Sequence, residues 1–182
     1  MQQPIIRRAG PAEAPRLAEL GAATFSETFA HLYPPEDLAA FLAETHTPSA
    51  HAAILADARQ AVWVALAGEE PVGYAHAGPC ELPHPEVTAR CLELKRLYVL
   101  KPWQGAGVAV RLMDAAMAWM QAAAPPAIYL GVWSENHRAQ RFYARYGFGH
   151  AGEYEFPVGA SRDREYIYKL RPAHRISTSG AS

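Results

Sequence analysis

A strand, a turn with two glycines and a helix follow one another in the middle of the chain. Residues 92–100 have the composition of a strand, Gln104 to Ala109 form the turn, and apolar residues recur at helical spacing over 108–120. The first amides of a helix have no intrahelical partner, and the helix dipole adds partial positive charge at the same end. Gly105 and Gly107 lack side chains, so an anion can approach the backbone closely there. This segment therefore predicts a binding site for a phosphate-bearing cofactor.

Two common phosphate-binding loops do not match this turn. The dinucleotide fingerprint G-x-G-x-x-G requires a third glycine, where this chain has Val110, and an acidic residue at the end of the next strand, which the run 127–132 lacks. A P-loop requires a Gly-Lys pair, and the chain contains none. The remaining pattern, Q-x-x-G-x-A after a strand, is compatible with a phosphate site and also with a turn that merely connects a strand to a helix.

Length and composition indicate one globular domain. The chain has 182 residues, of which 50% are hydrophobic, and a formal net charge of -1. We expect residues 1–170 to form that domain and the small, polar segment 171–182 to be a disordered tail. The near-neutral net charge argues against a general nucleic-acid-binding protein, which would carry an excess of basic residues. No apolar run approaches the roughly 18 residues of a membrane span. The first residues do not resemble a signal peptide, and two cysteines, Cys80 and Cys91, indicate reduced thiols, so we expect a cytoplasmic location.

The order of apolar patterns and turn residues predicts a mixed sheet with helices on its faces, an α/β (α+β) architecture. Strands are expected at 4–8, 61–66, 72–77, 91–100, 127–132, 149–156 and 165–170, and helices at 12–22, from 34 onward, at 47–59, 108–120 and 135–146. Residues 24–33 show no clear periodicity. Ser134 is expected to cap the helix that follows it and Gly147 to end that helix, with Gly159 in the turn of the last hairpin.

Two ordered motifs lie at residues 94–109 and 129–148, and both resemble those of the GNAT N-acetyltransferase superfamily. Leu94-Lys95-Arg96-Leu97-Tyr98-Val99, followed by Pro102-Trp103-Gln104-Gly105-Ala106-Gly107-Val108-Ala109, resembles its acetyl-CoA motif. Its second motif is similar to Tyr129-Leu130-Gly131-Val132, Asn136, Ala139, Phe142-Tyr143 and Tyr146-Gly147-Phe148. The resemblance extends over nearly the whole chain. It implies a GNAT-like fold: a mixed, mostly antiparallel sheet with helices on both faces and a splayed central pair of parallel strands.

Three shorter segments, at residues 24–29, 130–133 and 156–159, carry a narrower resemblance to the PaiA group of bacterial polyamine (spermidine/spermine) N-acetyltransferases. It rests on Thr24-Phe25-Ser26-Glu27-Thr28-Phe29, Leu130-Gly131-Val132-Trp133 and Phe156-Pro157-Val158-Gly159. In that group the segment after the glycine is usually acidic. Here it contains Arg162 and Arg164, which would disfavour a polycation if this loop helps to bind the substrate.

The resemblance also implies which residues hold acetyl-CoA. Backbone amides of the turn would bind the pyrophosphate, and the strand Leu97-Tyr98-Val99 would pair with the peptide-like pantetheine arm. The amide of Val99 or Leu97 would donate to the thioester oxygen. The expected cofactor-binding residues are Leu97, Tyr98, Val99, Gln104, Gly105, Ala106, Gly107, Val108, Ala109, Asn136 and Tyr143.

Tyr143 and Glu93 are the expected catalytic residues. Tyr143 shares a helix face with Asn136, and its phenol could protonate the departing thiolate; it could also be a residue that only packs the helix against the sheet. Many GNAT members place a glutamate at the position of Glu93 to draw the amine proton through water, although here Glu93 could instead pair with Lys95 or Arg96.

The acceptor site is expected near Glu27, His31 and Tyr33, because the first helical region borders it in the family. His76 and His84 are alternative site residues, although a single histidine in a strand or loop is more often structural. No metal is expected, since no group of ligand residues has a matching spacing.

The sequence therefore predicts an acetyl-CoA-dependent N-acetyltransferase that acts on a primary amine of a small molecule, first of all a polyamine, by direct attack in a ternary complex. Acetylation of a protein N-terminus or of another metabolite, a non-catalytic acyl-CoA sensor, and an acyl-enzyme on Cys91 are the alternatives. The expected partners are the amine and, as one option, a second copy of the chain in a homodimer, with no nucleic acid and no membrane.

Overall fold

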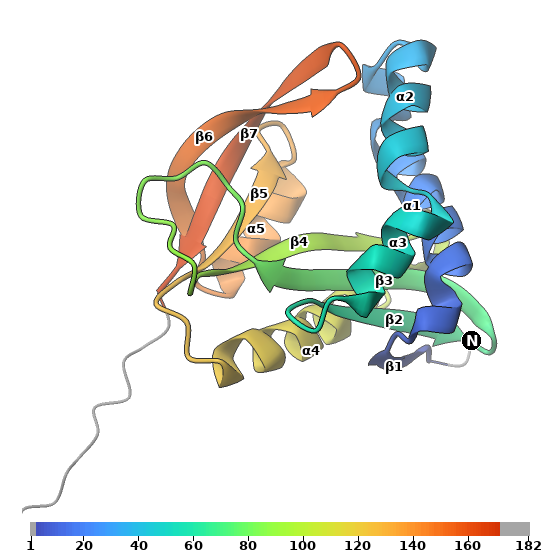
Figure 1. The fold of residues 1–182 in the computed structure, drawn as a ribbon, viewed down its shortest axis with the longest axis horizontal. Coiled ribbons are helices and arrows are strands. Elements are labelled where there is room, and N and C mark those ends of the chain that lie inside the picture. The colour runs from blue at the N-terminus through green and yellow to red at the C-terminus, as the bar shows by residue number, and fades with distance from the viewer. Residues whose placement is uncertain (1–2, 172–182) are drawn as a thin grey trace, which may run out of the picture.

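A computed structural model describes residues 3–171 as a seven-stranded sheet with five α-helices (Figure 1). The strands are β1 (Ile5–Arg8), β2 (Ala61–Ala67), β3 (Glu70–Pro79), β4 (Leu92–Val99), β5 (Ile128–Trp133), β6 (Gly149–Val158) and β7 (Ser161–Leu170). The helices are α1 (Ala14–Phe29), α2 (Pro35–Thr45), α3 (Pro48–Ala56), α4 (Val108–Ala122) and α5 (His137–Arg145), with 3-10 turns at Pro11–Glu13, Ala30–Leu32 and Lys101–Trp103. Of the segment 171–182, expected to be a disordered tail, residues 172–182 lie outside the described residues.

The sheet has the order β1-β2-β3-β4-β5-β7-β6, and every neighbouring pair except β4 and β5 is antiparallel. The parallel pair is short. It is confined to Leu92 opposite Ile128 and Glu93 opposite Tyr129, after which the two strands separate. The expected mixed sheet with a splayed central pair is thus confirmed.

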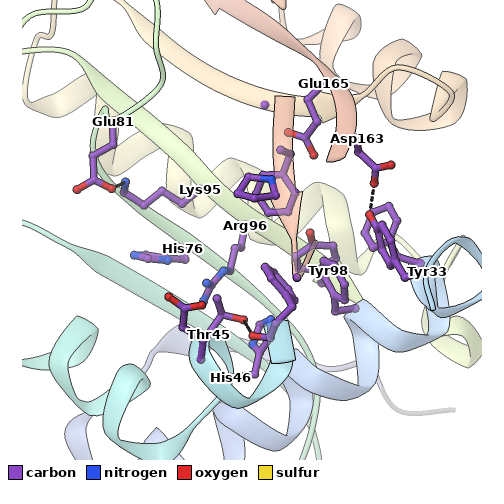
Figure 2. A pocket seen from close by; sticks show the side chains of 18 of the residues that line it. Tyr33, Thr45, His46, His76, Glu81, Lys95, Arg96, Tyr98, Asp163 and Glu165 are labelled. Carbon is purple, nitrogen blue, oxygen red and sulfur yellow. Dashed lines mark hydrogen bonds and ion pairs between the residues drawn. The ribbon is translucent and has the colours of Figure 1, made fainter. Parts of the chain in front are cut away.

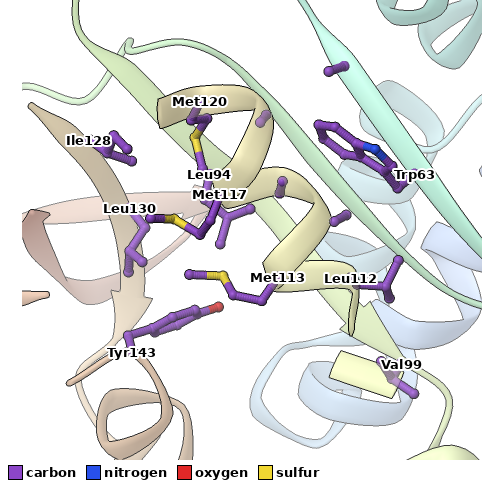
Figure 3. Packing of buried hydrophobic residues seen from close by; sticks show 14 of the residues in the cluster. Trp63, Leu94, Val99, Leu112, Met113, Met117, Met120, Ile128, Leu130 and Tyr143 are labelled. Carbon is purple, nitrogen blue, oxygen red and sulfur yellow. The ribbon is translucent and has the colours of Figure 1, made fainter. Parts of the chain in front are cut away.

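Helices cover both faces of the sheet. On one face, α4 buries a stripe that includes Leu112, Met113 and Met120 against the apolar side chains of β2 to β5 (Figure 3). On the other face, α1 and α3 pack over Val62, Val64 and Tyr74. No helix within residues 3–171 combines the length and the apolar character that crossing a bilayer requires.

The first helix extends further than its sequence pattern predicted. Within residues 24–33, where the sequence shows no clear periodicity, the chain continues α1 to Phe29 and then forms the 3-10 turn Ala30–Leu32. Thr24, Phe25 and Phe29 are buried and continue the spacing of Leu17 and Leu20. The periodicity was obscured because these aromatic side chains pack on α2 and on the β6–β7 end of the sheet rather than on the central core.

The cap of α5 also differs from the expectation. Asn136, not Ser134, is the N-cap, and its side-chain oxygen accepts a hydrogen bond from the Ala139 amide at 3.1 Å. Ser134 still follows the path of β5, because its own amide donates to the Arg164 carbonyl at 3.1 Å. The expected end of this helix is confirmed, since Gly147 has a φ of 90° directly after the cap residue Tyr146.

The last hairpin reaches across to α2. Its turn contains Gly159, with a φ of 57°, as the sequence predicted. Asp37, in the first turn of α2, accepts hydrogen bonds from the Ala160 amide at 2.9 Å and the Ser161 hydroxyl at 2.6 Å. Figure 1 shows the tip of the β6–β7 hairpin beside the start of α2. Two segments far apart in sequence are thereby joined around a cavity.

Candidate active site

The gap between β4 and β5 forms the first of two adjoining cavities. Beyond Glu93, β4 pairs with no strand of residues 3–171 on its β5 side. The Leu100 amide donates to Val72 on β3 at 2.9 Å, so the alternation of a strand directs the amides of Val99 and Leu97 toward the gap. The cavity has a volume of about 350 Å³. It therefore offers free backbone donors and acceptors to an extended, peptide-like ligand.

The glycine turn closes one end of this gap. Gly105 and Gly107 have φ values of 84° and 78°, a left-handed conformation that favours glycine. A side-chain carbon added to either glycine would have no neighbour within 4 Å, so the turn is open on its outer side. No side chain of the described residues caps the start of α4. The Arg111 amide is the first in this helix to bond back to the turn, where it donates to the Gly107 carbonyl at 3.2 Å. The amides before Arg111 are thus free to bind an anion, as the cofactor pyrophosphate would require.

Gln104 connects this turn to its surroundings. Its side-chain amide donates to the Val99 carbonyl at 3.0 Å, and its side-chain oxygen accepts from Arg138 at 3.2 Å. Arg138, in the first turn of α5, also lines the cavity and adds a positive charge near the turn. The sequence reasoning missed Arg138, because its proximity to the turn depends on how α5 packs.

Most of the residues expected to bind the cofactor line this cavity. They are Leu97, Tyr98, Val99, Gln104, Gly105, Ala109, Asn136 and Tyr143. Ala106, Gly107 and Val108 do not line it, and the Val108 side chain lies in the core under α4. Val108 and Gly107 could therefore meet a ligand only through their backbone.

Tyr143 both packs and borders the cavity. Its ring contacts Phe142 and Phe148, with ring centroids 5.4 and 6.3 Å away, and Figure 3 shows it at the edge of the core near Met113. Burial raises the pKa of its phenol, and the Glu165 carboxylate raises it further. The phenol is therefore protonated at neutral pH and able to donate a proton. Its ring contacts and its place on the cavity wall agree with packing and with proton donation alike, so the choice between the two roles that the sequence left open stays a prediction.

A second cavity, of about 470 Å³, lies between the first two helices and the β6–β7 hairpin (Figure 2). Its wall is rich in aromatic and acidic side chains: Phe25, Phe29, Tyr33, Phe41, Tyr98, Tyr154 and Phe156, with Glu44, Glu81, Glu93, Asp163 and Glu165. Six residues line both cavities, namely Phe29, Lys95, Arg96, Tyr98, Gly131 and Glu165. An acceptor in the second cavity would thus meet a cofactor in the first.

The charges of β7 alternate between two faces of the strand. Asp163 and Glu165 line the second cavity, whereas Arg164 pairs with Glu153 and Arg162 donates to backbone carbonyls of the turn. The expectation that these arginines could oppose a polycation is therefore not met by their placement. A period of two residues brings only the carboxylates to the cavity.

Glu93, the expected base, borders the second cavity but not the first. Its carboxylate accepts a hydrogen bond from the Glu81 amide at 3.0 Å and pairs with Lys95 at 3.3 Å. This is the pairing that the sequence left open as an alternative.

Glu165 is the acidic residue that sequence reasoning missed. It accepts a hydrogen bond from the Tyr154 hydroxyl at 2.5 Å. Burial raises its pKa to about 7. Gly131 makes room for this pair: a side-chain carbon there would lie 2.6 Å from the Tyr154 oxygen and 2.7 Å from a Glu165 oxygen. The one available signal was the alternation of basic and acidic residues over 162–165.

Of the expected acceptor residues, only Tyr33 lines the cavity, where its hydroxyl donates to Asp163. Glu27 lies outside both cavities and accepts from the Lys101 amide at 3.0 Å, and His31 is exposed on the 3-10 turn. His76 lines the second cavity, bonded to Gln60 at 2.6 Å, whereas His84 does not.

Cys91, the alternative nucleophile, is buried in a separate cluster and borders neither cavity. An acyl-enzyme on this thiol has no support in the geometry.

Comparison with known proteins agrees with this architecture. A family model described as the acetyltransferase (GNAT) family matches residues 22–148. The chain belongs to the GNAT acetyltransferase family. An uncharacterised N-acetyltransferase of Mycobacterium tuberculosis is 32% identical to this GNAT chain over 155 residues, which cover 85% of the chain and 95% of the relative. Another, from Lactobacillus delbrueckii subsp. lactis, is 27% identical over 157 residues, or 86% and 91% of the two chains.

Solved structures share the GNAT fold. The PaiA N-acetyltransferase of Thermoplasma acidophilum, solved in complex with coenzyme A, aligns with a TM-score of 0.76 at 16% identity, over 94% of this chain and 100% of its own. A GNAT protein of Rhodopseudomonas palustris aligns with a TM-score of 0.72 at 20% identity, over 94% and 98%. These identities support the fold alone. Family membership identifies the chain as an acetyl-CoA-dependent acetyltransferase.

Proposed function

We propose that this enzyme transfers the acetyl group of acetyl-CoA to a primary amine of a small molecule, by direct attack within a ternary complex. The observation that carries the proposal is the junction of the two cavities at Tyr98, Gly131 and Glu165. One cavity runs along the unpaired edge of β4, and the other presents carboxylates that suit a cationic amine.

The described residues fit acetyl-CoA at both ends of the first cavity. The free amides at the start of α4, with Arg138 nearby, would hold the pyrophosphate. The amides of Val99 and Leu97 would pair with the pantetheine arm and meet the thioester oxygen. Acetyl-CoA supplies an acetyl group activated as a thioester. Tyr143 would give a proton to the thiolate sulfur as the carbon–sulfur bond breaks.

Polyamines are the first acceptors to test. Five carboxylates line the second cavity against two cations, Lys95 and Arg96, and Lys95 is already paired with Glu81 and Glu93. Three buried histidines lie nearby, namely His46, His51 and His76. Burial lowers the pKa of each, so they add no positive charge at neutral pH. This balance, together with the PaiA resemblance, supports a cationic acceptor.

The test is release of free thiol from acetyl-CoA in the presence of spermidine, spermine, monoamines, amino acids and a short peptide with a free N-terminus. We expect rapid release with at least one small amine and slow release with the peptide. A protein that binds acetyl-CoA by calorimetry but acetylates none of these amines would contradict the proposal and favour the acyl-CoA sensor. Preference for the peptide would favour protein N-terminal acetylation.

We also propose a cytoplasmic location and a homodimer as the assembly, on the sequence alone. Light scattering on the purified chain tests the homodimer, and a mass of a single chain at micromolar concentration would contradict it.

A further inference from the structure

Glu165 occupies a place that no other carboxylate in residues 3–171 shares. It lines both the second cavity, proposed for the amine and called the acceptor cavity from here on, and the first cavity, proposed for acetyl-CoA and called the cofactor cavity. Its partner across the strands is Trp133, the last residue of β5. This end of β5 lies beyond Tyr129, in the part of the strand that has separated from β4. A carboxylate at this junction is within the region where an acceptor amine and an acetyl donor must meet.

The contacts of Glu165 leave it free to exchange a proton. Its hydrogen-bond donor among the described residues is the Tyr154 hydroxyl at 2.5 Å, and no lysine, arginine or histidine of that part of the chain forms an ion pair with it. Glu93 differs, because Lys95 and the Glu81 amide hold its charge. A paired carboxylate is a weaker proton acceptor than an unpaired one.

We infer that Glu165 is the catalytic residue that removes the proton from the acceptor ammonium, and that Tyr154 is a positioning residue that fixes the orientation of its carboxylate. This inference rests on the proposed function. It assigns to β7 the role that the family resemblance suggested for Glu93 on β4.

The proton balance of the step is complete. The acceptor ammonium gives one proton to the Glu165 carboxylate, which passes it to solvent. The nitrogen lone pair then forms the new bond to the acetyl carbon while the carbon–sulfur bond breaks. Tyr143 protonates the sulfur, and the second proton lost by the nitrogen restores the phenol through solvent. Overall one ammonium and one thioester give one amide, one thiol and one released proton.

The charged and titratable groups around Glu165 set the pH at which it works. The groups that interact with it are Tyr154 on β6, Asp163 on its own strand, Glu93 and Tyr98 on β4, Tyr143 on α5, and Tyr33 before α2. Lys95 and Arg96 on β4 line the same two cavities. Burial raises its pKa to about 7, and the Asp163 and Glu93 charges act in the same direction, whereas the Tyr154 hydrogen bond lowers it. The carboxylate must be ionised to accept a proton, so kcat/KM should rise with pH through about 7.

The first measurement is the pH profile of kcat/KM for the parent and for Glu165→Gln. We expect the parent to show an ionisation near 7 that stays in place when the acceptor is exchanged for an amine of different pKa. In Glu165→Gln this ionisation should be lost and the rate at neutral pH should fall by about 100-fold. The affinity for acetyl-CoA should stay the same within about twofold, since Gln preserves the shape of the side chain.

Two further variants separate a catalytic role from a structural one by the sign of a shift. Tyr154→Phe removes a donor to the carboxylate, so the ionisation should move to higher pH. Glu93→Gln removes a neighbouring negative charge, so the ionisation should move to lower pH and remain visible. If Glu93 were the base, Glu93→Gln would abolish the ionisation instead.

A readout without turnover completes the test. Carbon-13 NMR of glutamate side chains in the acetyl-CoA-free protein should show one carboxyl that titrates near 7 and is missing from Glu165→Gln. The inference is overturned if the parent acetylates amines and Glu165→Gln keeps both its pH profile and a rate within about twofold. If the parent acetylates no amine at all, the proposed function fails, and the inference fails with it.

Discussion

At the scale of single residues, Tyr143 shows how a side chain can belong to the core and to the site at once. Its ring packs against Phe142 and Phe148 while its edge borders the cofactor cavity. If it protonates the thiolate, Tyr143→Phe should lower kcat by about 100-fold or more, because a positioned general acid is lost. The Kd for acetyl-CoA should change little, since one hydroxyl contributes about 1 kcal/mol. A kcat within about twofold of the parent, measured with saturating amine, would remove Tyr143 from the mechanism.

A second residue-scale prediction concerns the glycine turn. Gly107→Glu should weaken acetyl-CoA binding by at least about tenfold, or about 1.4 kcal/mol, because it adds bulk and negative charge where an anion binds. Gly68→Glu is the matched control. Gly68 has a similar positive φ of 64° and equally open surroundings, but it lies in the β2–β3 turn. Calorimetry should show weaker binding for Gly107→Glu only, and equal loss in both variants would reduce the effect to backbone strain.

At the scale of elements, the contact between α2 and the β6–β7 hairpin determines the shape of the acceptor cavity. Asp37 holds the hairpin turn through Ala160 and Ser161, and the hairpin carries both Asp163 and Glu165. Asp37→Ala should therefore raise KM for the amine several-fold while the Kd for acetyl-CoA remains unchanged.

The control for this prediction is Glu36→Ala. Glu36 lies in the same first turn of α2 and has the same favourable interaction with the helix dipole, but it forms no hydrogen bond within the described residues. Steady-state kinetics with both substrates varied should place the KM effect in Asp37→Ala alone. Similar changes in the two variants would mean that the stability of α2, not the hairpin contact, is responsible.

At the scale of the whole molecule, three buried histidines couple folding to pH. Burial lowers the pKa of His46 to about 3, of His51 to about 4 and of His76 to about 3, and the nearby Arg96 charge lowers them further. In the unfolded chain each of these histidines regains its ordinary pKa of 6.5 and is therefore protonated below that pH. The unfolded chain thus binds more protons below pH 6.5, and the free energy of unfolding falls by up to about 1.4 kcal/mol per pH unit for each histidine.

Glu165 acts in the opposite direction, because its raised pKa makes the folded chain take up a proton between about 4.5 and 7. Because three histidines destabilise the fold on acidification and only Glu165 stabilises it, the free energy of unfolding should fall as the pH is lowered. Urea unfolding followed from pH 7.5 to 4.5 should show this loss, and His51→Gln should reduce its slope. A flat profile between pH 6.5 and 5 would contradict the prediction.

The features that the sequence determined by itself are local ones. The left-handed glycines of the turn, the start of α4 and the end of α5 at Gly147 depend on residues close together in the chain. Likewise, the apolar spacing of α4 and the strand runs was sufficient to predict a mixed sheet with helices on both faces. Such features follow from local backbone preferences and from the periodicity of apolar residues, so they can be predicted without knowledge of the fold.

The tertiary structure alone decided which charges meet. The sequence predicted Ser134 as a helix cap, but pairing with β7 continues to Ser134, whose amide donates to the Arg164 carbonyl. In the sequence, Glu165 is one of several charged residues in a segment of alternating basic and acidic side chains. The register of β7 turned Glu165 to the cavity and Arg164 away, and Gly131 on another strand made space for it. These outcomes depend on pairing between distant segments, where a shift of one residue would exchange the two faces.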